Sequence, residues 1–269
     1  MAGRGAPVLA AFAEFNAPAS WRAIDFLSDL HLGDDTPRTF DAFAAHLRHT
    51  PADAVFILGD LFEVWVGDDA RFEGSEADCA AVLAEAASHR TVGFMVGNRD
   101  FLVGTEMLAA CGVLLLADPM VLTAFGERVL LTHGDALCLS DLDYQRFRAQ
   151  VRSAQWQRDF LAKSLAERRR IARDIREQSR QRKAAQATGE WIDVDAAAAL
   201  HWMRHANTPT LVHGHTHMPR SEELAPGYVR HVLSDWDLDH AGAVARADVL
   251  RWRRGGLERI APAAAAGSC

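Results

Sequence analysis

The sequence contains few of the residues that would indicate redox chemistry, thiolate metal sites or nucleic-acid binding. The 269 residues include only four cysteines, without a CxxC pair or metal-ligand spacing: Cys79, Cys111, Cys138 and Cys269. Reduced thiols in a cytosolic protein are the simplest interpretation. Lysine and arginine number 29 against 36 acidic residues, a formal net charge of -7, which argues against a general nucleic-acid binder.

Long apolar runs are also missing. No stretch approaches the roughly 20 apolar residues that span a bilayer. The apolar run at 8–12 is too short for an export signal and is soon followed by Glu14 and Asn16. We therefore expect a cytoplasmic protein, which is still able to lie on a membrane surface.

Five short apolar segments, each bounded by Gly, Asp or His, have the pattern of buried strands. They are residues 23–27, 54–58, 92–96, 128–131 and 210–212. Intervening segments at 40–47, 79–88 and 105–111 carry apolar residues at helical spacing. This alternation predicts an α/β sandwich. Ligands in open α/β sheets bind beyond the carboxyl ends of the strands, so the polar residues after these strands should converge.

The alternation of predicted strands and helices is interrupted in two places. Residues 141–205 lack a strand-like run and are rich in Arg and Lys from 152 to 183. We interpret them as a helical lid insert, although a solvated helical hairpin fits the pattern equally well; a basic amphipathic helix suits a membrane surface or an anionic substrate. Residues 228–234, 242–252 and 257–260 resemble strands, with Gly255-Gly256 in the last turn. The expected division is an extension at 1–20, one domain at 21–261 and a tail at 262–269.

The polar motifs that follow the five strands are weak when taken singly. They are Asp29-x-His31, Gly59-Asp60, Gly97-Asn98-Arg99-Asp100, His133-Gly134-Asp135 and Gly214-His215-x-His217. An Asp after a strand also caps helices, Gly-Asn also forms turns, and a lone His is often a satisfied core residue. Their combination in this order is far more specific.

In this order the motifs resemble the ligand signature of the calcineurin-like metallophosphoesterases, from about residue 24 to residue 217. The resemblance implies an α/β/β/α sandwich and two metal ions, for which imidazoles and carboxylates suit Mn, Fe or Zn. By resemblance, one ion is held by Asp29, His31, Asp60 and His217, and the other by Asp60, Asn98, His133 and His215. Two divalent ions about 3.5–4 Å apart need a bridging carboxylate, and Asp60 matches that position.

The expected chemistry is in-line attack on phosphorus by a water that the metals acidify. Asp60, Asn98, Arg99 and His133 would be catalytic, with Arg99 neutralising charge on the phosphoryl oxygens. Asp100 and Asp135 adjoin proposed ligands and are expected to orient them; a helix-capping role for Asp100 fits equally.

Longer runs are similar to the UDP-2,3-diacylglucosamine hydrolases, in particular 59–69, 97–102, 133–138 and 213–217. That resemblance implies cleavage of the pyrophosphate of UDP-2,3-diacylglucosamine to lipid X and UMP in lipid A biosynthesis. It also implies two Mn²⁺ ions per chain, a lid over two acyl chains and peripheral attachment to the inner membrane, with neither nucleic acid nor an obligate protein partner.

The same resemblance carries substrate contacts onto particular residues. They are Asn98, Arg99, Asp141, Ser179 and His215, with Lys183 standing where the family usually has Asn. Three other functions remain open. A related phosphodiesterase or nucleotide pyrophosphatase would act on a soluble substrate, a non-catalytic scaffold would be expected to lose ligands, and a basic lid would bind nucleic acid.

Overall fold

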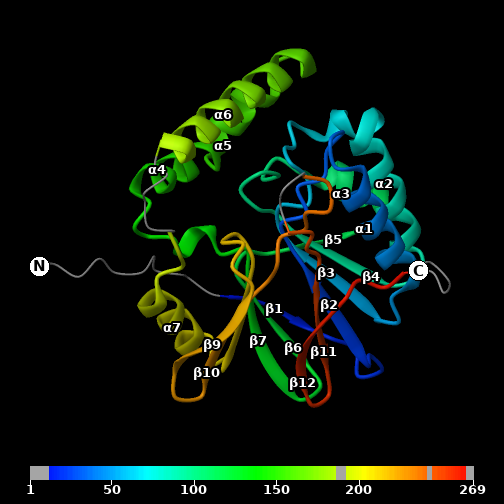
Figure 1. Cartoon of the computed structure of the whole chain (residues 1–269), viewed down its shortest axis with the longest axis vertical. Coiled ribbons are helices and arrows are strands. Elements are labelled where there is room, and N and C mark those ends of the chain that lie inside the picture. The colour runs from blue at the N-terminus through cyan, green and yellow to red at the C-terminus, as the bar shows by residue number, and fades with distance from the viewer. Residues whose placement is uncertain (1–11, 186–191, 241–243, 265–269) are drawn as a thin grey trace, which may run out of the picture.

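The computed structural model describes residues 12–185, 192–240 and 244–264, and within 179–185 only the side chain of Gln181. Two six-stranded sheets pack face to face (Figure 1). Sheet A holds, in spatial order, β1 (Ala13–Asn16), β6 (Met120–Ala124), β7 (Glu127–Thr132), β8 (Thr210–His213), β10 (Tyr228–Val232) and β9 (Arg220–Ala225). Sheet B holds β12 (Gly256–Ile260), β11 (Val249–Arg253), β2 (Ala23–Leu27), β3 (Ala54–Leu58), β4 (Thr91–Met95) and β5 (Leu114–Leu116).

The central strands explain the continuous apolar runs of the sequence. Every residue of β2 and β3 is buried, as expected for parallel strands covered on both faces. β2, β3 and β4 are parallel to one another in sheet B, and β7 is parallel to β8 in sheet A. The carboxyl ends within each set therefore lie at one edge, where the polar motifs follow.

Helices cover both outer faces. On sheet B lie α1 (Pro37–His49), α2 (Gly74–Ala87) and α3 (Thr105–Cys111), with Phe43 and Leu83 in the core that they share with the sheet. On sheet A lies α7 (Ala196–His205), which buries Trp202 (Figure 1). A third core between the sheets contains Phe56 and Trp252. The α/β/β/α sandwich predicted from the sequence is confirmed.

The segment between β7 and α7 is helical where the structure describes it. After the short 3₁₀ helix η2 (Asp135–Leu137), the chain forms α4 (Leu142–Val151), α5 (Ala154–Leu161) and α6 (Leu165–Ala185). The other 3₁₀ helix, η1 (Asp68–Phe72), lies between β3 and α2. These three helices extend beyond one end of the sandwich (Figure 1). Asp141 and Ser153 begin α4 and α5 by accepting backbone N–H bonds, as N-cap residues do.

Several strands differ from the sequence-based expectation. Ala13–Asn16, expected in an N-terminal extension, forms edge strand β1 parallel to β6, and Phe15 packs against Phe56. Strand β11 begins at Val249 rather than at 242, and residues 241–243 lie outside the described part. Strands β5, β6 and β9 lacked a recognised signal. Among the described helices, none is long and apolar enough to cross a bilayer.

Candidate metal centre

The polar motifs at the strand ends adopt an unusual backbone conformation. Five non-glycine residues of these motifs have φ between 50° and 68°: Asp29, His31, Asp60, His215 and His217. This left-handed region is uncommon for residues with a Cβ and persists where the surroundings enforce it. The enforcing bonds cross between loops: Asp29 N donates to Gly59 O, and His31 N donates to Asp60 O. The sharp turns direct side chains from both sheets into one place.

The first group of converging side chains is Asp29, His31 and His217, whose candidate ligand atoms all lie within 4.8 Å of one another. His31 Nε2 is 3.3 Å from His217 Nε2, and His217 Nε2 is 3.4 Å from Asp29 Oδ1. The Asp29 carboxylate is fully buried, and its Oδ1 has no hydrogen-bond partner among the described residues. A buried carboxylate oxygen facing two imidazole nitrogens fits a cation.

A second group adjoins the first. Asp29, Asp60 and His133 also fall within 4.8 Å of one another. Asn98 Oδ1 lies 3.0 Å from His133 Nε2 and 2.7 Å from His215 Nδ1. Asp60 lies between the groups, 4.0 Å from His31 Nε2 and 3.7 Å from His133 Nε2. The structure thus brings together all seven residues that the sequence proposes as ligands, although Asp29 as well as Asp60 touches both groups.

Three of the four imidazoles direct one ring nitrogen into the site while the other lies near a supporting group. Nδ1 of His133 lies 2.9 Å from Leu58 O, and Nδ1 of His31 lies 3.5 Å from Glu63 Oε2. Nδ1 of His217 lies 3.4 Å from Asp235 Oδ2. A hydrogen bond such as that between His133 and Leu58 O fixes the tautomer of a metal-binding histidine. The donor set contains nitrogen and oxygen without thiolate, which fits Mn, Fe or Zn.

The electrostatics of the site depend on competition between burial and neighbouring charge. Burial lowers the pKa of His31, and of His215 to about 3. Burial also disfavours the charged form of His133, but Asp60 and Asp29 outweigh it and raise its pKa to about 9. For His217, bonds to Asp235 and Asp29 overcome burial and raise the pKa to about 10. Divalent cations would compete with these protons.

Two residues that support the ligands were not predicted from the sequence. Asp235 follows β10 and faces His217, and Arg246 Nε holds it in place at 2.7 Å from Oδ1. Ser28 donates from its hydroxyl to Asp29 Oδ2 over 2.6 Å. Asp235 stands just after a predicted strand, which is the same signal that identified the other acidic residues.

The two adjacent aspartates have different surroundings. Asp100 accepts N–H bonds from Gly97 at 2.7 Å and Leu61 at 2.8 Å, so it ties the Asp60 loop to the Asn98 loop. It caps no described helix, because α3 begins after Gly104. Asp135 contacts α4 through Tyr144 Oη at 2.5 Å, and not the His133 ring.

The proposed substrate-contacting residues differ in how close they lie to the metal centre. Arg99 N donates to Asp60 Oδ1 at 2.8 Å, and its guanidinium Nε lies 3.9 Å from Asp60 Oδ2, at the centre. Asp141 accepts the N–H of Tyr144 as the cap of α4. Ser179 and Lys183 lie on α6, but their side chains are outside the described residues. On the same helix, Arg176 pairs with Glu63, which faces His31.

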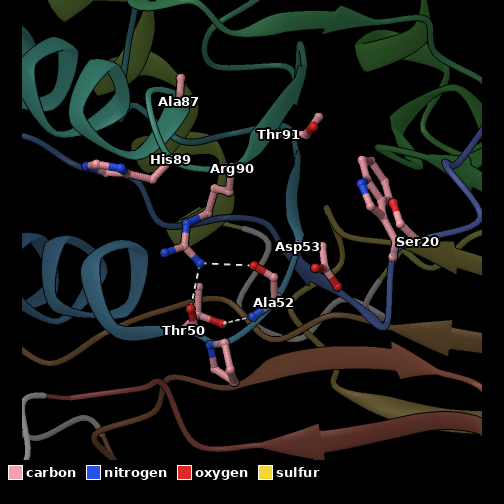
Figure 2. Close-up of a pocket in the computed structure, with 10 residues that line it drawn as sticks. Ser20, Thr50, Ala52, Asp53, Ala87, His89, Arg90 and Thr91 are labelled. Atoms are coloured by element: carbon pink, nitrogen blue, oxygen red, sulfur yellow. Dashed lines mark hydrogen bonds between the residues drawn. The ribbon is translucent and has the colours of Figure 1, made fainter.

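The described residues line two cavities. One of about 290 Å³ lies between the helices after β7, with mostly apolar walls: Phe147, Val151, Trp156, Phe160, Ile171 and Ile175, with Gln150, Asp159 and Lys163 at its margin. The other, of about 640 Å³, lies at the amino ends of β3 and β4, away from the converging side chains (Figure 2). There Arg90 donates to the carbonyls of Thr50 and Ala52, so its charge serves the local backbone.

The chain is similar to several known proteins. A family model for the calcineurin-like phosphoesterases matches residues 23–219. A UDP-2,3-diacylglucosamine hydrolase from Chromobacterium violaceum is 45% identical over 216 residues, 80% of this chain and 90% of the relative. One from Stenotrophomonas maltophilia is 38% identical over 250 residues, which cover 87% of this chain and 98% of the relative. Among solved structures, the Escherichia coli phosphoesterase Yfce matches at 14% identity and TM-score 0.44, over 89% of this chain and 99% of its own.

The residue order, the sandwich and the similarity over most of both chains agree with one another. The chain belongs to the UDP-2,3-diacylglucosamine hydrolase family of calcineurin-like phosphoesterases.

Proposed function

We propose that this chain hydrolyses the pyrophosphate bond of UDP-2,3-diacylglucosamine to 2,3-diacylglucosamine 1-phosphate and UMP, in lipid A biosynthesis. The observation that carries the proposal is the convergence of four imidazoles, two carboxylates and one amide at the strand ends, in a chain of this family. Helices α4–α6 beside them enclose an apolar cavity.

We further propose that two Mn²⁺ ions occupy the site. Asp29, His31, Asp60 and His217 would hold one, and Asp60, Asn98, His133 and His215 the other. When bound, the ions would lower the pKa of a water and withdraw charge from the phosphoryl oxygens. The neutral Asn98 limits the negative charge around them.

The side chains of the protein have separate tasks in this proposal. Arg99, held against Asp60 and 17% exposed, would bind a phosphoryl oxygen and offset its developing charge. Leu58 O and Asp235 keep the rings of His133 and His217 turned toward the reacting group. Fixed donors of this kind need no reorganisation during the reaction.

The helices α4–α6 would form a lid that binds acyl chains. The 290 Å³ cavity has six apolar lining residues, and each buried methylene stabilises the complex by about 0.8 kcal/mol. Exposed basic residues on α6, such as Arg170, would favour attachment to the anionic cytoplasmic face of the inner membrane. Asp141, Ser179 and Lys183 are proposed to contact the sugar and its substituents.

The proposal is tested by comparing UDP-2,3-diacylglucosamine with UDP-N-acetylglucosamine, which has the same pyrophosphate and lacks the long acyl chains. We expect UMP from the first and at least about 100-fold less turnover of the second, since burying several methylenes accounts for about 3 kcal/mol. Equal turnover of both would contradict the lid assignment. Cleavage of the soluble compound alone would instead favour a nucleotide pyrophosphatase.

A further inference from the structure

Asp135 is a buried carboxylate that connects a proposed ligand loop to the helix above it. It is 0% exposed and lies two residues after His133. Its Oδ2 accepts hydrogen bonds from Tyr144 Oη at 2.5 Å and from Arg148 Nε at 2.8 Å. Both donors belong to α4. A third donor, Arg152 Nη2, lies 3.5 Å away just beyond the end of that helix.

The partners of Asp135 reach the centre themselves. The Tyr144 ring packs on the His215 ring, with centroids 5.8 Å apart and planes inclined by 32°. Arg152 Nη2 donates to Gly97 O at 3.0 Å, on the residue that precedes Asn98. One carboxylate therefore joins the His133 loop, the Asn98 loop and His215 through a single helix.

The chemistry of the contacts explains why a carboxylate is needed here. Two guanidinium groups that are mostly buried require a nearby negative charge, and a buried pair that loses one member is strongly destabilised. Bonds to an ionised acceptor are also about twice as strong as neutral ones. Arg146, on the same helix, makes only an exposed contact with Asp143.

We infer that Asp135 is a positioning residue that couples the placement of α4 to the geometry of the metal centre. This inference rests on the proposed metal centre. Coupling between two sites is reciprocal, so cation binding must stabilise α4 to the same extent that an ordered α4 favours cation binding. Helix α4 would then be a fixed part of the centre, and Asp135 would act through Tyr144 and Arg152 without touching substrate.

The test uses the metal-free full-length protein, Mn²⁺ alone as probe, and two readouts: the Mn²⁺ dissociation constant by calorimetry and hydrogen exchange of residues 142–151. In the wild type we expect Mn²⁺ to slow exchange in α4, since exchange reports local opening. Asp135→Asn should weaken Mn²⁺ binding about 10- to 100-fold, as supporting residues of metal sites do, and remove that protection. Arg146→Gln, the control on the same helix, should leave both readouts unchanged.

Tyr144→Phe provides a milder variant in case Asp135→Asn does not fold. It keeps the ring against His215 and removes only the hydroxyl, so it should lose part of the α4 protection while retaining its fold. If the wild type does not bind Mn²⁺, the proposed metal centre falls, and this inference with it. If the wild type binds Mn²⁺ but both variants match it in affinity and in α4 exchange, only the positioning role of Asp135 is overturned.

Discussion

Gly97→Ala should separate the two loops that carry Asp60 and Asn98. A Cβ at residue 97 would lie 2.1 Å from Asp60 Oδ1 and 2.5 Å from Asp60 N, whereas real Cβ contacts essentially never fall below 3.0 Å. To reach 3.0 Å, Asp60 Oδ1 must therefore be displaced by about 0.9 Å and the backbone N of Asp60 by about 0.5 Å. Backbone strain contributes nothing, because Gly97 is not among the positive-φ glycines of the described chain.

The displacement has two consequences of different size. Overpacking of this kind costs about 1–3 kcal/mol of folding stability, which lowers Tm by about 2–12 °C in a protein of this length. A misplacement of about 1 Å in a reacting centre costs about 100-fold in rate. We expect kcat to fall at least about 100-fold in a protein that remains folded at 25 °C, measured by UMP release and circular dichroism.

The matched control is Gly126→Ala, in the β6–β7 hairpin. A Cβ there meets nothing within 4 Å, but φ is +89°, which costs about 1–2 kcal/mol for a residue with a side chain. The control should lose a similar amount of stability and keep its turnover. Normal kcat in Gly97→Ala would refute the close approach of the Asp60 and Asn98 loops, and equal losses in both variants would attribute the effect to stability alone.

Other predictions concern the ligands, the phosphate site and a buried ion pair. Asp60→Ala should abolish turnover with the circular dichroism spectrum retained, and detectable Mn²⁺-dependent activity would argue against its bridging position. Arg99→Ala should lower kcat/KM about 100-fold, which is roughly the loss expected when one charged contact to a phosphoryl oxygen is removed. An unchanged kcat/KM would show that Arg99 is not part of the phosphate site. Asp25 is fully buried: burial opposes its ionisation, but Arg251, His46 and Thr50 lower its pKa to about 2. A lowered pKa stabilises the fold above pH 3.8, and this effect is lost as pH falls toward 2. Over that range the wild type should therefore lose about 2 kcal/mol more stability than Asp25→Asn, measured by urea unfolding at each pH.

Much of the fold was predictable because burial on both faces leaves a clear pattern. Residues 23–27 and 54–58 were expected as strands and form β2 and β3 with the same bounds. Strand β5 is apolar but has only three residues, Leu114–Leu116, which is too short to show a strand period, and β9 is mostly polar, with Arg220, Glu222 and Glu223 among its six residues. Strand β1 is held by its pairing with β6, a contact more than one hundred residues away in the sequence.

The site likewise contains residues that the sequence predicted and residues that it did not. The proposed ligands were recognisable because each follows a strand end in a fixed order, which local sequence records. Asp118, which accepts the backbone N–H of His133 at 3.2 Å, gave no such sign. The contacts of Tyr144 and Arg148 with Asp135 were not predicted either, because a carboxylate is locally similar whether it faces a ligand or a helix. Residues defined by long-range contacts needed the structure.

Metal-dependent hydrolysis is tested most directly by incubating UDP-2,3-diacylglucosamine with metal-stripped protein, with and without added Mn²⁺, and assaying both products. We expect no turnover without metal, and release of UMP and 2,3-diacylglucosamine 1-phosphate in equal amounts once Mn²⁺ is added. Metal-independent turnover, or none of this substrate with Mn²⁺ bound, would contradict this expectation.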